Sequence, residues 1–158
     1  RNPAGHNYDA PEALDNALLA EHLDLLAAGK PAPLPIHDFS THKRQAEVQW
    51  VQPTPVVLLE GILILAIPEI RERCSLKVFV QAPEAIRLER RIARDKSKRG
   101  RSRESVLAQY RQTVEPMHRI HVAPSAGGVD LLLSGTGAIE DAENRLMEAL
   151  RRAAPGSL

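Results

Sequence analysis

The sequence predicts an α/β domain with a mainly parallel β-sheet, and three observations point to this class. Three short apolar runs, at residues 56–65, 76–82 and 129–135, are typical of strands that helices cover on both faces. Segments with helical spacing precede, separate and follow these runs. A chain of 158 residues can bury roughly two thirds of its unfolded surface. We therefore expect a single domain over residues 1–158.

The first expected elements are a helix and a hairpin. Leucines recur at helical spacing within residues 11–29, and Gly29 is a good helix stop. Residues 30–55 are proline-rich at both ends and contain the β-prone run AEVQWV. We expect this second segment to form a strand or hairpin that extends away from the core.

The run VVLLEGILIL at residues 56–65 predicts a covered parallel strand that ends in Glu60 and Gly61. Ligand crevices of open α/β sheets lie at the carboxyl ends of their strands. Glu60 is therefore a candidate for holding Mg²⁺ or water opposite a phosphate. A surface glutamate or a helix cap explains this residue equally well.

The second half of the chain predicts alternating helices and strands. Residues 68–74 have a helical pattern, 76–82 a strand pattern, and Pro83 opens the next helix. Residues 103–120 are expected to be helical, and residues 129–135 form the third expected strand. Gly135 and Gly137 predict a turn, and residues 138–153 predict an amphipathic closing helix.

Residues 90–103, RRIARDKSKRGRSR, carry eight basic side chains and one acidic side chain, Asp95. The other residues carry thirteen basic and nineteen acidic side chains, whereas a protein that follows a nucleic-acid backbone usually spreads its positive charge more widely. Gly100 provides a turn through which Arg99 and Arg101 could close over an anion as bidentate donors. We expect a lid for a few phosphates, and the alternative is a solvated charged face.

The single cysteine, Cys74, cannot form an internal disulfide, and no apolar run is long enough to span a membrane. These features predict a reducing, cytoplasmic setting without a membrane partner. The sequence begins with Arg1 in a loop-like segment. We therefore expect that an N-terminal segment is missing from it.

Several motifs resemble, in the same order, those of the uridine/cytidine kinases, which are P-loop kinases. They are HNYDAPEALD (residues 6–15), IHDFSTHKR (36–44), VVLLEGIL (56–63), RRIARDKSKRGR (90–101), ESVLAQYRQTVEPMH (104–118) and VDLLL (129–133). The resemblance implies a P-loop kinase-like parallel sheet with flanking helices, a β-hairpin excursion and an Arg-rich lid. It also implies transfer of the γ-phosphate of ATP, with Mg²⁺, to the 5′-hydroxyl of uridine or cytidine.

The resemblance implies a role for each matching residue. Nucleoside binding is implied for Tyr8, Asp9, His37, Phe39, His42, Arg91, Arg101 and Gln109. Within this set, Asp9 matches a ribose contact, and His37, Phe39 and His42 match base contacts. Arg94 and Arg99 match arginines that face the ATP phosphates, and Glu60 matches the acid near Mg²⁺. The implied catalytic residues are therefore Arg94, Arg99 and Glu60.

The chain departs from the family pattern at three places. The family commonly has tyrosine where this chain has His37, and residues 134–138 read SGTGA where relatives carry a Pro-Arg-Gly run. No G-x-x-x-x-G-K-[ST] pattern occurs, so the P-loop strand and helix are absent from these residues. The resemblance places the family's catalytic aspartate between the P-loop helix and the first residues of this chain, so that aspartate is absent too. We expect the C-terminal portion of a longer kinase, inactive alone, rather than a naturally shortened relative.

Two other functional classes stay open at this stage. One is a catalytically dead kinase-like subunit, and the other is an RNA-binding module that uses the Arg-rich segment. For the kinase we expect no nucleic-acid partner. We also expect a homo-oligomer such as a tetramer, because residues 36–52 resemble a region that family members use for assembly.

Overall fold

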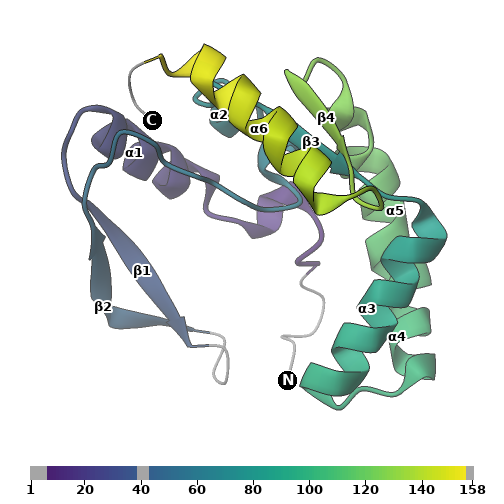
Figure 1. Ribbon diagram of the computed structural model, residues 1–158. Coiled ribbons are helices and arrows are strands. Elements are labelled where there is room, and N and C mark those ends of the chain that lie inside the picture. The colour runs from purple at the N-terminus through teal and green to yellow at the C-terminus, as the bar shows by residue number, and fades with distance from the viewer. Residues whose placement is uncertain (1–6, 39–42, 156–158) are drawn as a thin grey trace. The chain divides into compact units, whose positions relative to one another are not determined.

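Figure 1 shows the chain as a computed structural model, which describes residues 7–38 and 43–155. The chain divides into two compact units, one ending at Cys74 and the other beginning at Ser75. The prediction of one domain over residues 1–158 stays a prediction. Over the described ranges, no helix combines the length and the apolar character needed to cross a membrane.

The first unit begins with helices, as expected. A short 3₁₀ turn, η1 (Pro11–Ala13), precedes helix α1 (Asn16–Ala27). The Asp15 side chain caps α1 by accepting a hydrogen bond of 3.2 Å from the amide of Leu18. After the helix, Gly29 adopts a left-handed φ of +71°. This conformation favours glycine and ends the helix where the sequence predicts its stop.

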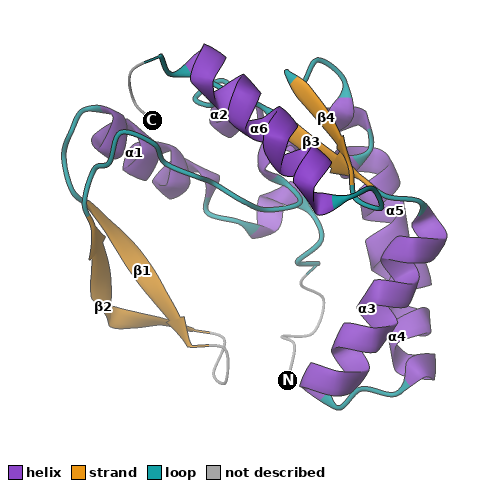
Figure 2. Cartoon of the chain, viewed as in Figure 1, coloured by secondary structure: helices purple, strands orange, loops and turns teal. Residues whose placement is uncertain are grey.

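The expected hairpin follows α1 (Figure 2). Strands β1 (Ala32–Asp38) and β2 (Lys43–Val51) pair antiparallel, from Ala32 opposite Val51 to Asp38 opposite Lys43. The register is irregular between Pro35 and His37. Prolines have no amide hydrogen to donate, so they interrupt the ladder at β1. Helix α1 packs against β1 and against helix α2 (Pro68–Arg71).

The strand predicted at residues 56–60 is wrong. These residues form a loop that leads to a 3₁₀ turn, η2 (Ile64–Ala66). The side chain of Leu58 is 87% exposed, and Val56, Val57 and Ile62 are also exposed. A strand that is apolar on both faces needs neighbouring strands to satisfy its backbone groups, and the described residues place no strand beside it.

The second unit contains the parallel sheet. Strands β3 (Val78–Gln81) and β4 (Leu131–Ser134) pair in parallel, with Val78 opposite Leu131 and Gln81 opposite Ser134. The α/β class is therefore confirmed as a small parallel sheet with helices. Helix α6 (Ile139–Ala153) packs against β4 (Figure 1).

A helical stretch connects the two strands. Helix α3 (Glu84–Arg99) follows Pro83, and helix α4 (Arg103–Gln109) packs against it. The predicted helix over residues 103–120 is divided by two wider π-helical segments, η3 (Tyr110–Val114) and η4 (His118–Val122), on either side of α5 (Glu115–Met117). Pro116 lies between these segments, and a proline cannot donate the hydrogen bond that a regular helix requires. A short 3₁₀ turn, η5 (Pro124–Ala126), ends the stretch.

Candidate functional site

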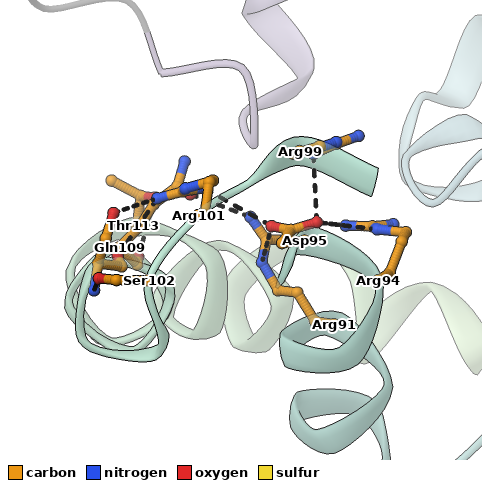
Figure 3. Close-up of polar contacts among 9 residues, drawn as sticks. Arg91, Arg94, Asp95, Arg99, Arg101, Ser102, Gln109 and Thr113 are labelled. Carbon is orange, nitrogen blue, oxygen red and sulfur yellow. Dashed lines mark hydrogen bonds and ion pairs between the residues drawn. The ribbon is translucent and has the colours of Figure 1, made fainter. Parts of the chain in front are cut away.

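A fully buried carboxylate organises the basic segment. Asp95 lies on α3, its side chain is 0% exposed, and four arginines surround it (Figure 3). We call these residues the arginine cluster. Its members are Asp95, Arg91, Arg94, Arg99 and Arg101. The cluster brings together four of the arginines that the sequence analysis singled out.

The two carboxylate oxygens of Asp95 receive different partners. Oδ1 accepts a hydrogen bond of 2.9 Å from Nε of Arg94 and lies 3.4 Å from Nη1 of Arg99. Oδ2 lies 3.6 Å from Nη1 of Arg101 and 3.8 Å from Nε of Arg91. The two Oδ2 contacts are ion pairs without hydrogen-bond geometry, since neither Oδ2 nor Nε of Arg91 has a hydrogen-bond partner within the described ranges.

The local sequence explains this convergence. Arg91 and Arg99 lie four residues before and after Asp95, so all three lie on one face of α3. Gly100 then ends the helix at a φ of +60°. The backbone carbonyl of Asp95 accepts the amide of Gly100 and, at 3.1 Å, that of Arg101. The turn therefore directs Arg101 back toward the carboxylate of the same aspartate.

Gln109 of α4 connects the cluster to the next helix. Its Oε1 accepts a hydrogen bond of 2.5 Å from Nη1 of Arg101 and one of 3.2 Å from Nη2 of Arg91. Nη2 of Arg101 also donates to the hydroxyl and the carbonyl of Ser105, at 3.0 and 3.2 Å. Arg91, Arg101 and Gln109 were grouped as nucleoside contacts by resemblance, and in this structure they form one hydrogen-bonded set.

The four arginines differ in how much of each side chain water can reach. Arg91 and Arg101 are 20% and 28% exposed, whereas Arg94 and Arg99 are 47% and 57% exposed. One carboxylate cannot neutralise four guanidinium groups, so the cluster keeps an excess of positive charge. Half-exposed guanidinium groups with free planar donors suit phosphate oxygens. The outer pair, Arg94 and Arg99, therefore presents this charge to solvent.

Asp95 is also a stabilising residue for the unit. Burying a carboxylate is costly unless opposite charges surround it, and removing one partner of a buried ion pair typically costs about 3–5 kcal/mol. The site residues predicted from the sequence did not include Asp95, although it is the single acidic residue in residues 90–103. Two features of the sequence indicate Asp95: it is the single acidic residue in a basic segment, and arginines lie four residues away on both sides.

The predicted site residues of the first unit lie on a turn, a strand and a loop. Tyr8 and Asp9 share a turn, and the side chain of Tyr8 is 46% exposed. His37 is exposed on β1, where it pairs with Arg44 of β2. Phe39 and His42 lie outside the described residues. The nucleoside-binding roles of these residues stay predictions.

Glu60, the predicted Mg²⁺ contact, is exposed in the loop that replaces the expected strand. Across residues 7–38 and 43–155, no three histidine, cysteine, aspartate or glutamate side chains come together as a metal-binding group. Mg²⁺ usually binds through one or two carboxylates plus water and substrate phosphates. The role of Glu60 near Mg²⁺ therefore stays a prediction.

Two groups near Glu84 and Arg87 of α3 have shifted pKa values. Tyr110 is buried, and burial raises the pKa of its hydroxyl, which lacks a hydrogen bond of good geometry within the described part of the chain. Burial lowers the pKa of His118, and the positive charge of Arg87 lowers it further. Tyr110 borders a groove of about 400 Å³, whose other residues are Glu84, Leu88, Arg111, Glu115 and Arg119. No predicted site residue borders this groove.

Comparisons with known proteins show the family to which this chain belongs. The model of the "Phosphoribulokinase / Uridine kinase family" matches residues 1–138. The uridine kinases of Chloroflexus aurantiacus and Chloroflexus aggregans are each 45% identical to this chain over 134 residues, which cover 85% of this chain and 64% of each relative. The uridine kinase of Cronobacter sakazakii is 43% identical over 131 residues, covering 83% and 62%. The chain thus spans slightly less than two thirds of these relatives, and it belongs to the phosphoribulokinase/uridine kinase family.

Proposed function

We propose that this chain is the nucleoside-binding and lid portion of a kinase that transfers the γ-phosphate of ATP to the 5′-hydroxyl of uridine or cytidine. The observation that carries the proposal is the arginine cluster, in which Arg94 and Arg99 stay half exposed beside the buried Asp95. The proposal is also supported by relatives that are 43–45% identical to this chain and are named "Uridine kinase".

The proposed roles follow the division within the cluster. The outer arginines, Arg94 and Arg99, bind the phosphates of ATP and neutralise negative charge as the phosphoryl group moves. The inner arginines, Arg91 and Arg101, share Gln109 and orient the nucleoside. In this proposal the cluster is therefore the Arg-rich lid that the resemblance implies.

Further nucleoside contacts are proposed from the family resemblance. Asp9 and Tyr8 bind the ribose side, and His37, Phe39 and His42 surround the base. Mg²⁺, when bound with ATP, neutralises phosphate charge, and Glu60 is the proposed carboxylate near it. A histidine at position 42 offers either a donor or an acceptor, depending on its tautomer. Uracil and cytosine differ in this property at one ring position, so we propose that the kinase accepts both.

Two parts that the proposed reaction needs have no match in these 158 residues. They contain no G-x-x-x-x-G-K-[ST] pattern, whose backbone amides and lysine cradle the β- and γ-phosphates. They also contain no match to the family's catalytic aspartate, which accepts the hydroxyl proton. We propose that the 158-residue chain alone does not turn over, and that activity belongs to a polypeptide that also carries these two parts.

A nucleoside panel tests the proposed function. The full-length gene product is incubated with ATP, Mg²⁺ and uridine, cytidine or adenosine, and the monophosphates are separated and quantified. Uridine and cytidine should be phosphorylated, and adenosine should not. Phosphorylation of adenosine at the rate of uridine contradicts the base assignment. Nucleoside binding without any turnover supports the catalytically dead subunit instead.

The same preparation tests the RNA-binding alternative. Asp95 engages four of the eight basic side chains of residues 90–103, which reduces the charge available for a long polyanion. Affinity for single-stranded RNA should therefore be weak at 150 mM salt. Tight RNA binding that falls steeply between 50 and 200 mM salt would favour the RNA-binding module.

A further inference from the structure

We propose that Asp95 is a positioning residue that acts on the outer arginines, Arg94 and Arg99, while Gln109 positions the inner arginines, Arg91 and Arg101. This inference rests on the proposed function, and it assigns the phosphate side and the nucleoside side of the site to different supporting residues. The ligand of the outer arginines, which Asp95 orients, is the phosphate chain of a nucleoside triphosphate. Asp95 touches no substrate in this account and works only through the arginines.

The first argument is the distribution of partners. Within residues 7–38 and 43–155, the guanidinium groups of Arg94 and Arg99 contact Asp95 and no second carboxylate or amide oxygen. Nε of Arg94 donates a hydrogen bond of 2.9 Å to Oδ1, and Nη2 of Arg94 forms an ion pair of 2.9 Å with the same oxygen. The orientation of the outer pair therefore depends on one carboxylate.

The inner pair has a second support. Arg91 and Arg101 lie 3.8 and 3.6 Å from Oδ2 of Asp95, without hydrogen-bond geometry. Their hydrogen bonds go to Oε1 of Gln109, at 3.2 and 2.5 Å, and Arg101 also donates to Ser105. Loss of the Asp95 charge thus leaves the inner pair attached to α4, whereas it leaves the outer pair without a fixed direction.

The second argument is burial. The Asp95 side chain is 0% exposed, and its backbone carbonyl holds the amides of Gly100 and Arg101. The carboxylate therefore cannot move to follow a ligand, and it offers a fixed reference point for guanidinium groups that water partly surrounds. A carboxylate that prearranges the outer pair lowers the cost of ordering long side chains when the phosphates bind.

Three variants of the full-length gene product test this inference. Asp95→Asn removes the carboxylate charge while keeping the shape of the side chain. Gln109→Ala removes the shared acceptor of the inner pair. Glu89→Gln is the matched control, because Glu89 is exposed on the same helix and its substitution changes the net charge by the same amount.

The expected kinetic results distinguish the role of Asp95 from the role of Gln109. Asp95→Asn should lower kcat at least about ten-fold and leave the KM for uridine within about two-fold, because misplaced charges act on phosphoryl transfer. Gln109→Ala should raise the KM for uridine at least about five-fold with a much smaller change in kcat. Glu89→Gln should leave both values within about two-fold. An Asp95→Asn variant that matches Glu89→Gln, or that raises the uridine KM as Gln109→Ala does, overturns the inference.

The rate of hydrogen exchange, measured by NMR, tests the role of Asp95 independently of kinase activity. In ¹⁵N-arginine-labelled protein, the Nε hydrogen of Arg94 should exchange slowly with water because Asp95 accepts it. Its exchange should be at least about ten-fold faster in Asp95→Asn and unchanged in Gln109→Ala. If the wild-type protein phosphorylates no nucleoside, the proposed function fails, and this exchange rate still decides whether Asp95 orients Arg94. Equal exchange in wild type and Asp95→Asn overturns the inference.

If the Asp95→Asn variant does not fold, the Asp95→Glu variant tests the same inference. It keeps the charge and moves the carboxylate by one methylene group. Its kcat should fall by about three-fold or more while the KM for uridine stays within about two-fold, and a thermal melt confirms that the variant is folded. A folded Asp95→Glu variant with wild-type values of both constants, or with a change confined to the uridine KM, contradicts the positioning role.

Discussion

The amide of Gly135 donates a hydrogen bond of 2.7 Å to the carbonyl oxygen of Gln81, directly after the last residue pair of the parallel sheet. A Cβ atom at position 135 would lie 3.2 Å from that oxygen and 3.3 Å from side-chain carbons of Val80 and Ala82. A side chain at position 135 would therefore be crowded where β3 and β4 end.

The first prediction concerns this contact. Gly135→Ala should reduce the free energy of unfolding by about 1–3 kcal/mol, because the added methyl group forces the end of the sheet apart. Gly137→Ala is the control, since its Cβ atom would meet only Ser134 at an ordinary 3.5 Å. Urea unfolding of both variants measures the difference. Equal losses in the two variants would show that the crowding at Gly135 is relieved without cost.

A second prediction concerns the turn after α3. Gly100 has a φ of +60°, and nothing lies within 4 Å of the position that a Cβ atom would occupy. Gly100→Ala should therefore lower the free energy of unfolding through backbone strain alone, by about 1–2 kcal/mol. Gly100→Asn should cost less, because asparagine tolerates the left-handed conformation better. Urea unfolding checks the order, and an equal cost for alanine and asparagine would contradict it.

The sequence predicted the regular elements well wherever a local pattern is sufficient. The leucine spacing of α1, the stop at Gly29 and the start of α3 after Pro83 all depend on neighbours a few residues away. The strands β3 and β4 were also found, because each is a short apolar run between helices and the two pair with each other. Such features require no knowledge of distant parts of the chain.

The failures depend on partners that a local pattern does not reveal. Residues 56–60 have the composition of a covered strand, yet a strand forms only where another strand accepts its hydrogen bonds. The role of Asp95 was missed for a related reason. Arg101 reaches the carboxylate only after Gly100 has reversed the chain, and burial of Asp95 depends on packing that a local pattern does not show, so the sequence showed a basic run with one acid rather than a buried carboxylate.

A third prediction tests the phosphate role of the outer arginines. In the full-length kinase, Arg94→Ala should lower kcat by about 10²–10³-fold and leave the KM for uridine within about two-fold, since the lost charge matters most in the transition state. Arg90→Ala removes the same charge from an exposed position of α3 and should have little effect. Steady-state kinetics with both substrates varied provide the comparison. An equal loss of uridine affinity and turnover would argue against a role at the phosphates.

The fourth prediction concerns the pH dependence of stability. Burial, aided by Arg87, lowers the pKa of His118 below its usual value of 6.5, and the carboxylates of Glu115 and Glu84 oppose this only in part. The unfolded chain therefore binds the proton more readily. The stability from neutral His118 is complete above about pH 6.5 and is lost as the pH falls from there toward the lower pKa of the folded state.

Urea unfolding at pH 7.5 and pH 5.5 measures this effect. The wild-type protein should lose more stability between these values than His118→Gln does. The control His121→Gln retains His118 and should keep the wild-type difference. An identical pH dependence in wild type and His118→Gln would show that burial of His118 does not contribute.

The central claim is that these residues bind the nucleoside and provide the lid of a uridine/cytidine kinase whose phosphate cradle lies outside them. The most direct test is ATP-dependent formation of uridine monophosphate, measured side by side for the 158-residue chain and for the full-length gene product. We predict turnover of about 1–100 s⁻¹, typical of kinases, for the full-length product and none for the chain alone. Turnover at that rate by the 158 residues alone, or its absence from the full-length product, would contradict the account.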